Sequence, residues 1–365
     1  MMGDSSRSYV RVERPDPIVR ADSVANVAFE RRDVESMARF LVDFGLIAHE
    51  TRDGIRYFRG YADQPYCVAI SPSNVDRLER IAFEARSSSD LDRLATATGA
   101  QLEPAQGPGG GTRVRLTDPD GLCVDLIHGA QRAATLPTRR EPIPFNTPGN
   151  KRRVNETVRP PLEPSPVFRL GHVVLQRPDF DRSIQWYMHH FGLIPTDVFA
   201  LPDGRPNLAF MRLDRGSEPA DHHTLALLGG PATNLLHVSF ETFDIDSLGQ
   251  GQQFLRAAGW RHHWGIGRHK YGSQLFDYWK DPAGDEWEHY ADGDVMNVDY
   301  STGYHPLDRG GLWTWGDDLP DALRPKFSLR LLWSMLALGR QGKIDMSRMA
   351  GVKKALSVPP RRWLK

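Results

Sequence analysis

The chain has 365 residues, enough for two domains of ordinary size that each bury a core. Its 46 Lys and Arg residues balance its 46 Asp and Glu residues, which argues against a polyanionic partner such as nucleic acid. No stretch reaches the roughly 20 apolar residues of a membrane span, and the first residues lack the apolar core of a secretory signal. We therefore expect a cytoplasmic protein without a membrane span.

The cysteine and histidine content limits the kinds of metal site that are possible. Two cysteines, Cys67 and Cys123, are too few for a disulfide framework or a thiolate-rich metal site. A metal would have to be held by histidine and carboxylate side chains, and several of the 13 histidines lie between residues 172 and 289. For most of the 13 histidines we expect surface or packing roles, among them His49, His262, His263 and His305.

An internal repeat organises the chain from residue 24 onwards. Residues 24–47 and 170–194 each run from an alternating, strand-like segment through an amphipathic helix pattern to Phe-Gly-Leu-Ile. Each is followed by a strand that enters an Asp-rich helix start, at residues 80–94 and 235–248. Each half then ends in an Asp-Pro-x-Gly turn between two strands, at residues 113–129 and 275–293.

The repeat predicts an α+β fold of two domains, each built from two βαβββ modules. We assign residues 1–130 to an N-terminal domain, 131–166 to a linker rich in Pro and Arg, 167–294 to a C-terminal domain and 295–365 to an extension. Within the extension, turn-like order over residues 300–320 suggests a lid, and residues 327–338 predict one short amphipathic helix. From residue 321 onwards eleven basic residues outnumber two acidic ones, which we interpret as a solvated or packing tail.

Comparing the two halves identifies candidate metal ligands, because only the C-terminal half combines His172, His237 and Glu288. In the N-terminal half Asn26 stands in place of His172, Asp125 in place of Glu288, and His237 falls opposite the pair Ala82 and Phe83. If paired modules form one open barrel, the three side chains converge on its interior. Two imidazoles and one carboxylate on one face leave open positions on an octahedral ion, which suits iron(II) oxygen chemistry better than the four-coordinate geometry usual for zinc.

Residues 170–293 resemble the catalytic domain of the type I extradiol ring-cleaving dioxygenases, within the vicinal oxygen chelate superfamily. The motifs that carry the resemblance occur in order as LGHVVL, DHHTLALLGG, LLHVSFE, GRHKYGSQLFDY and DPAGDEWEHY. The resemblance implies iron(II) as the cofactor, with manganese(II) as second choice, and dioxygen as co-substrate. It further implies meta cleavage of a catechol in the catabolism of aromatic compounds, and we expect a homo-oligomer.

The same resemblance assigns roles to residues around the metal. His223 matches the acid–base histidine, whereas His269 and Tyr278 match the pair that hydrogen-bonds the substrate oxygens. On an alternating strand His222 is expected to face away, so we exclude it. The N-terminal half resembles the family's non-catalytic domain, and residues 300–320 resemble the C-terminal segment of the homoprotocatechuate enzymes.

Two alternatives on the same fold remain open, since a fold does not fix a function. One is a glyoxalase-like isomerase, although such sites generally use more carboxylates. The other is a metal-free binding protein of the bleomycin-resistance kind, against which the three ligands argue. For the substrate, Trp264 stands where homoprotocatechuate enzymes carry an arginine, which favours a neutral or apolar catechol, although Arg205 or Arg309 could pair with an acid.

Overall fold

The computed structural model describes residues 8–137, 144–159, 162–308, 312–318, 320, 338–340 and 345–356. Two βαβββ modules form the N-terminal half, and their eight strands build one sheet in the order β2-β3-β4-β1-β5-β8-β7-β6. The elements are β1 (Ala21–Arg31), α1 (Val34–Asp43), β2 (Ile47–Arg52), β3 (Ile55–Arg59), β4 (Val68–Pro72), β5 (Arg77–Ala85), α2 (Ser88–Thr98), β6 (Leu102–Pro104), β7 (Thr112–Thr117) and β8 (Cys123–His128).

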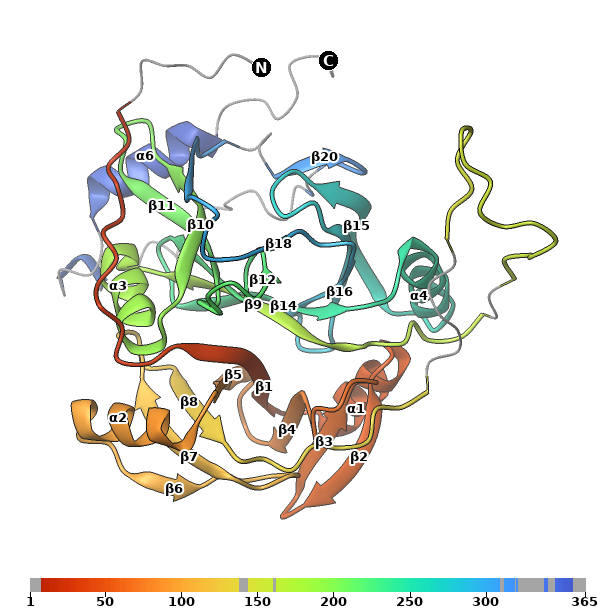
Figure 1. The fold of residues 1–365 in the computed structure, drawn as a ribbon, viewed down its shortest axis with the longest axis horizontal. Coiled ribbons are helices and arrows are strands. Elements are labelled where there is room, and N and C mark those ends of the chain that lie inside the picture. Colours follow the sequence, from red (N-terminus) through yellow and green to blue (C-terminus); the bar gives the residue numbers. More distant parts are fainter. Residues whose placement is uncertain are drawn as a thin grey trace.

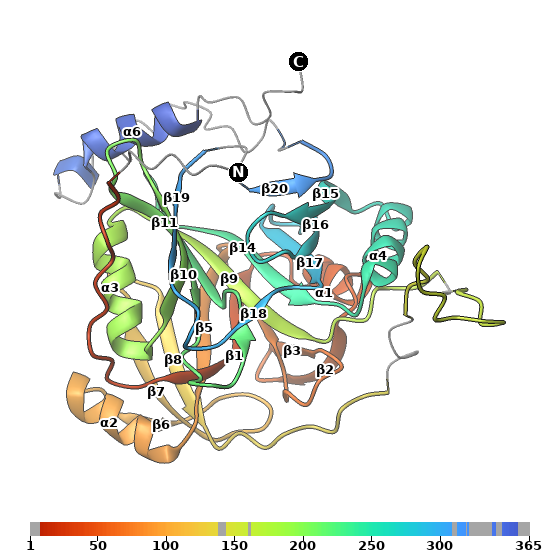
Figure 2. The ribbon, with the colours of Figure 1, turned by 45° about the horizontal axis from the view of Figure 1, so that its top comes forward.

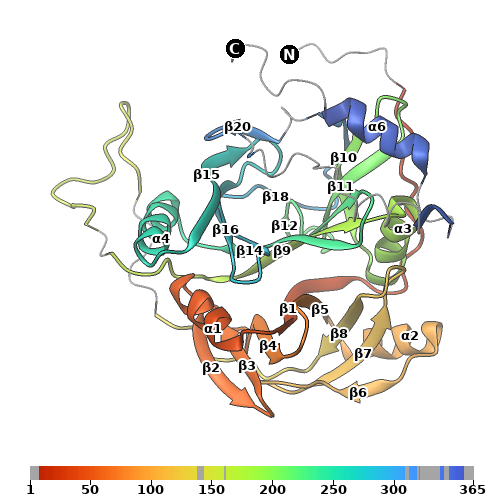
Figure 3. The same cartoon turned by 180° about the vertical axis from the view of Figure 1, so that it is seen from behind.

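Two further modules form the C-terminal half. They comprise β9 (Arg169–Arg177), α3 (Phe180–Phe191), β10 (Ile194–Ala200), β11 (Pro206–Arg212), the short β12 (Ala220–Asp221), β13 (Leu225–Gly229), β14 (Asn234–Glu241), α4 (Ile245–Ala257), β15 (Arg261–His269), β16 (Leu275–Lys280) and β17 (Glu286–Ala291). In Figure 1 this half, green to blue, lies above the red to yellow N-terminal half, and Figure 3 shows the same two layers from behind. The predicted α+β fold of four βαβββ modules is confirmed.

The extension after β17 adds strands to the C-terminal half. These are β18 (Val295–Met296), β19 (Gly303–Pro306) and β20 (Trp313–Trp315). Strand β19 pairs with β10 and β20 pairs with β15, so the sheet gains one strand at each edge and has ten strands in all (Figure 2). Helix α6 (Met346–Leu356) contains Arg348, which is buried against Asp181 of α3, so this part of the basic tail packs on the body. The helix expected at residues 327–338 lies almost wholly outside the described residues, at 327–337.

Local sequence explains where the helices begin. Asp33, Asp179 and Asp244 precede α1, α3 and α4, and each side chain accepts a hydrogen bond from a backbone N–H of the first turn. Glycine ends α3, because Gly192 adopts a left-handed conformation, with φ of 71°, that other residues rarely adopt. The predicted repeat therefore includes the signals that start and stop its helices.

The two halves share a core and exchange equivalent contacts across their boundary. Arg31, at the end of β1, reaches Asp281 in the Asp-Pro turn of the other half, with 3.0 Å between Nη2 and Oδ2. Arg177, at the end of β9, makes the reciprocal contact with Asp118 at 2.8 Å. Because each contact joins matching positions of opposite halves, the halves are related by a pseudo-twofold arrangement.

Two segments lie outside the modules. Residues 8–20 run along the C-terminal half, where Val10 N–H bonds the carbonyl of Gly204 (Figure 1). Residues 144–159, inside the expected linker, project away from the body in every view. Across the residues that the structure describes, no helix is long and apolar enough to cross a membrane.

Candidate metal centre

Five neighbouring strands each contribute one candidate side chain to the same region of the C-terminal sheet. In sheet order β9-β14-β17-β16-β15 these are His172, His237, Glu288, Tyr278 and His269. The register pairs Tyr278 directly with Glu288, and His172 with Ser239, two residues beyond His237. Because alternate residues of a strand share a face, one concave face collects the whole set. Residues that are far apart in sequence thus become neighbours.

The three expected ligands converge. Nε2 of His172 lies 3.3 Å from Nε2 of His237 and 3.1 Å from Oε2 of Glu288, and Nε2 of His237 lies 3.5 Å from the same oxygen. His172 and Glu288 are fully buried, whereas the His237 side chain keeps 16% of its surface exposed. Within the described residues, this is the one group of His, Cys, Asp or Glu side chains that is compact enough to hold a metal ion.

The surroundings of Glu288 fit a bound cation. Neither oxygen of this fully buried carboxylate has a hydrogen-bond partner of good geometry among the described residues. A buried carboxylate without donors is costly unless a positive charge faces it. Burial alone would raise the pKa of Glu288, yet the nearby imidazoles of His172 and His269 hold that pKa well below its ordinary value. The ionised carboxylate of Glu288, together with Nε2 of His172 and Nε2 of His237, is a suitable donor set for a divalent metal.

The other three candidates surround the cluster. The ring of His223, just before β13, lies with its centroid 4.1 Å from that of His172. Nε2 of His269 lies 2.9 Å from the hydroxyl of Tyr278 and 3.4 Å from Oε1 of Glu288. The structure therefore brings all six candidate residues together, on strands or at a strand end.

Burial sets the protonation states of these groups. It lowers the pKa of His223 well below its ordinary value, with the neighbouring His172 adding to the effect, and lowers that of His237 to about 4. Burial raises the pKa of Tyr278 well above its ordinary value, and Glu288 raises it further. At neutral pH the site thus contains neutral His223 and His237 rings, a Tyr278 phenol and an ionised Glu288.

The N-terminal half holds a guanidinium where the C-terminal half holds its cluster. In the strand register of the N-terminal half, Asn26 lies opposite Ala82, and Ala82 lies opposite Asp125. In the C-terminal half, His172 lies opposite Ser239 in the same way, and Ser239 lies opposite Glu288. The shared register makes Arg80, rather than the pair Ala82 and Phe83, the counterpart of His237. The match of His237 to Ala82 and Phe83 that we inferred from the sequence was wrong. The two segments align on Phe83 and Phe240, which lie three residues after Arg80 and His237.

Arg80 explains how this second position is stabilised. Its Nη1 donates to Oδ1 of Asn26 at 2.9 Å and lies 3.5 Å from Oδ2 of Asp125. The fully buried carboxylate of Asp125 also pairs with Arg115 at 2.8 Å. A permanent side-chain cation therefore neutralises the carboxylate, and no metal is needed there.

Sequence reasoning missed a buried network beside His223. His222, which was expected to face away from the site, is buried in this network: its Nδ1 lies 3.0 Å from Nδ1 of His223, and its Nε2 lies 2.7 Å from Asp197. Asp197 also binds His305, which had been expected to be a surface or packing residue. The available signal was Asp197 itself, the one charged residue of the fully buried strand β10.

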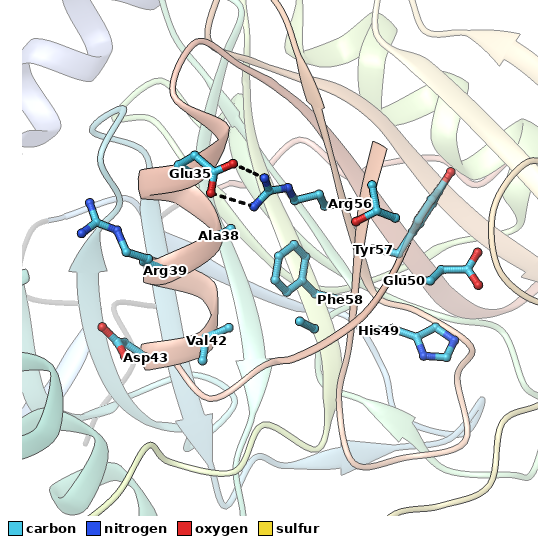
Figure 4. Close-up of a pocket in the computed structure, with 12 residues that line it drawn as sticks. Glu35, Ala38, Arg39, Val42, Asp43, His49, Glu50, Arg56, Tyr57 and Phe58 are labelled. Carbon is cyan, nitrogen blue, oxygen red and sulfur yellow. Dashed lines mark hydrogen bonds and ion pairs between the residues drawn. The ribbon is translucent and has the colours of Figure 1, made fainter. Parts of the chain in front are cut away.

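The remaining histidines of that group agree with their expected roles. His49 is exposed, while His262 and His263 pair with the carboxylates of Asp277 and Glu286. A groove of about 720 Å³ lies beside His49 in the N-terminal half, between α1 and the β2–β3 hairpin (Figure 4). It contains none of the six candidate residues, and its charged lining includes the mutually paired Glu35 and Arg56. We therefore assign the chemistry to the histidine cluster.

Comparisons with known proteins agree with this geometry. Residues 169–289 match the model of the Glyoxalase/Bleomycin resistance protein/Dioxygenase superfamily. Metapyrocatechase 2 of Cupriavidus necator is 29% identical over 326 residues, which cover 87% of this chain and 95% of the relative. An iron-dependent extradiol dioxygenase of Rhodococcus jostii is 25% identical over 324 residues, covering 83% and 99%.

Solved structures share the fold. The Mn(II)-bound glyoxalase of Novosphingobium aromaticivorans has a TM-score of 0.69 at 23% identity, covering 85% of this chain and 96% of its own. Homoprotocatechuate 2,3-dioxygenase of Brevibacterium fuscum, in complex with 3,4-dihydroxyphenylacetate, also has a TM-score of 0.69, at 21% identity with coverages of 85% and 94%. The architecture is thus used by enzymes of two different chemistries.

Proposed function

We propose that the protein is an iron(II)-dependent extradiol dioxygenase that cleaves the ring of a catechol. The observation that carries this proposal is the convergence of His172, His237 and Glu288 with the three further side chains of His223, His269 and Tyr278. The names of the two relatives support the reaction class, and one of those names specifies iron. Cleavage beside the two hydroxyls would give a hydroxymuconic semialdehyde-type product.

His172, His237 and Glu288 would hold the metal on one face. A redox-capable ion held there would let electrons pass from a catechol to dioxygen. The partial exposure of His237 and His269 fits an open side through which substrate enters. Neutral His223 can accept a catechol hydroxyl proton and return it to oxygen during ring opening.

Tyr278 and His269 would orient the substrate oxygens. Nδ1 of His269 lies 2.9 Å from the carbonyl of Leu312, which can only accept, so that nitrogen carries a hydrogen. Nε2 of His269 lies 2.9 Å from the Tyr278 hydroxyl and 3.4 Å from Oε1 of Glu288, so both side chains reach the edge of the cluster. From there the pair would hydrogen-bond the substrate oxygens. This arrangement fixes the position of the ring before it reacts.

Metal reconstitution tests the proposal. We expect full-length protein loaded anaerobically with iron(II) to consume dioxygen and form a yellow product from at least one catechol. Zinc-loaded protein should not, because zinc has no accessible redox change. The proposal is wrong if protein with one bound iron turns over none of a broad catechol panel, or if the zinc form is active.

A glyoxalase-like isomerase is the second candidate, favoured by the fold of the Mn(II)-bound glyoxalase. That reaction needs no dioxygen, so activity of the manganese-loaded protein on a hemithioacetal under anaerobic conditions would support it. A metal-free binding protein is the third candidate, and it would be supported if purified protein bound no metal tightly. The metal content of the protein therefore separates the binding protein from the two metal-dependent enzymes before any substrate is known.

The wall beside Tyr278 suggests the substrate class. Trp264 stacks on Tyr278 with 5.4 Å between ring centroids and packs against Phe276 and Trp313. Arg205 is not available for a substrate acid, because it pairs with Asp203 and Asp345 at the surface, and Arg309 lies outside the described residues. We infer a neutral or apolar catechol, so kcat/KM should be higher for alkyl or aryl catechols than for protocatechuate or homoprotocatechuate. The cytoplasmic location and the homo-oligomer stay predictions from the sequence.

A further inference from the structure

A buried hydrogen-bonded chain lies behind His223, on the side away from the metal cluster. Asp197, on β10, accepts a hydrogen bond on each of its oxygens. Oδ2 lies 2.7 Å from Nε2 of His222, and Oδ1 lies 2.6 Å from Nε2 of His305. Asp197 and His222 are almost fully buried. His305 belongs to β19, outside the repeated modules, so two separate parts of the chain meet at one carboxylate.

Two glycines leave room for this network. A Cβ at Gly303 would lie 2.2 Å from Oδ1 of Asp197 and 2.7 Å from Nε2 of His305. A Cβ at Gly272 would lie 2.9 Å from Nδ1 of His222. Any side chain at either position would displace the contacting residues. The network is therefore closely packed by the backbone around it, and both imidazoles are held against Asp197.

The geometry determines which nitrogens carry hydrogen. Burial raises the pKa of Asp197, but the hydrogen bonds from His222 and His305 outweigh it and lower that pKa below its ordinary value, so the group is an anion. An anionic carboxylate only accepts, so Nε2 of His222 carries a hydrogen, and in the neutral form of that ring Nδ1 is then bare. That bare Nδ1 lies 3.0 Å from Nδ1 of His223, which must therefore be the donor. His223 is left with a bare Nε2.

We propose that Asp197, acting through His222, is a positioning residue that holds His223 in the Nδ1–H tautomer, and that His305 fixes Asp197 in place. The proposal rests on the proposed function for its catalytic consequence, because a bare Nε2 is what His223 needs to accept a substrate proton. In a Ser-His-Asp triad the carboxylate likewise selects the histidine tautomer, and the wrong tautomer greatly slows the reaction. Here one more imidazole separates the carboxylate from the acid–base residue.

Nitrogen NMR tests the tautomer directly. Full-length protein with ¹⁵N-histidine, loaded with diamagnetic zinc, should show His223 protonated on Nδ1 and His222 on Nε2. In Asp197→Leu, which keeps the branching at Cγ but cannot accept a hydrogen bond, we expect His223 to become a mixture of tautomers. His223 protonated on Nε2 in the unaltered protein, or an unchanged tautomer in Asp197→Leu, would overturn the proposal.

A pair of variants at position 222 separates positioning from packing. The amide oxygen of His222→Asn lies near the place of Nδ1 and can still accept from His223, whereas His222→Leu offers no acceptor. In the iron-loaded enzyme we expect kcat to fall about 10–100-fold in His222→Leu and to recover in large part in His222→Asn. KM and iron content should stay unchanged in both. Equal losses in the two variants would contradict the proposal, even if Asp197→Leu failed to fold.

A matched control accounts for the loss of any buried carboxylate. Asp214 is almost buried and pairs with Arg20 at 2.9 Å, without contacting a histidine, so Asp214→Asn should leave kcat and the His223 tautomer unchanged. A loss in Asp214→Asn equal to that in Asp197→Leu would count against the proposal. If iron-loaded protein cleaved no catechol at all, the proposed function would fail, and the NMR result would still decide the tautomer.

Discussion

At the scale of single residues, the metal site is identified by ligands that the C-terminal copy of the repeat contains and the N-terminal copy lacks. His172 and Glu288 were identified from sequence because the N-terminal half holds Asn26 and Asp125 at the same positions. The network behind His223 could not be found in this way. Asp197 and His305 lie 108 residues apart, and only the parallel pairing of β10 with β19 brings them together.

Ligands and acid–base residue should respond differently to substitution. Replacing His172 with Ala removes one of three ligand atoms, so we expect bound iron to be lost. Replacing His223 with Phe should leave iron bound and lower single-turnover ring cleavage by about 10²–10⁴-fold, the typical contribution of a positioned general acid. Iron content measured beside the rate distinguishes the two. An iron-free His223→Phe protein would mean that His223 is itself a ligand.

His289 should make the metal-free protein sensitive to acid. Burial lowers its pKa from 6.5 to about 4, and its Nε2 bonds the carbonyl of Phe44 across the two halves. The unfolded chain therefore takes up a proton near pH 6.5 that the folded protein accepts only near pH 4. Stability should fall as the pH falls through this window, by at most about 3 kcal/mol.

The measurement is the free energy of unfolding between pH 7 and pH 4. In His289→Gln, whose amide can still donate to Phe44, we expect a smaller decrease over this range than in the unaltered protein. His49→Gln serves as the control, because His49 is exposed and its replacement should not change the slope. Identical slopes for the His289 variant and the unaltered protein would show that this histidine does not contribute.

At the scale of elements, the modules were predictable and the additions were not. Alternating strands, Asp caps and Asp-Pro turns recur in each half, and each is a local signal. The extension carries no repeat, so its order indicated a lid but not which strands it would join. Strand β20 pairs with β15, and β19 with β10, through contacts that depend on edges exposed only after the sheet has formed.

Strand β20 should support substrate binding through Trp313. This residue is 3% exposed and packs edge-on against Trp264, and the adjacent carbonyl of Leu312 accepts from His269. In Trp313→Ala we expect β20 to separate and His269 to lose its acceptor. The value of kcat/KM should then fall about tenfold, the equivalent of one hydrogen bond. Iron content should not change.

A neighbour on the same strand provides the control for this prediction. Trp315 is 44% exposed, so Trp315→Ala removes an indole of the same size without opening the core. Steady-state kinetics on the best catechol compares the two variants. Equal effects of the two substitutions would mean that β20 acts through its sequence as a whole and not through Trp313.

At the scale of the whole molecule, the halves depend on each other. The repeat predicted two similar halves, but it could not predict that they exchange Arg31 and Arg177 across their boundary. Each arginine is almost fully buried against an aspartate that also shapes the Asp-Pro turn of the opposite half. The N-terminal half, whose metal position is filled by Arg80, thereby supports the strands that carry the cluster.

Breaking one exchanged pair should destabilise both halves together. In Arg31→Met the carboxylate of Asp281 stays buried without its cation, a change that costs about 3–5 kcal/mol. The adjacent Arg32 is the control: its side chain is 66% exposed and lies 3.7 Å from Asp76, so Arg32→Met should cost less than about 1 kcal/mol.

All nine tryptophans follow residue 185, so their fluorescence reports the C-terminal half, while far-UV circular dichroism reports both halves. In denaturant unfolding we expect the two signals to coincide and to shift together in Arg31→Met, because one core unfolds as a unit. Separate transitions, or an Arg31→Met midpoint equal to that of Arg32→Met, would show that the halves are stable independently.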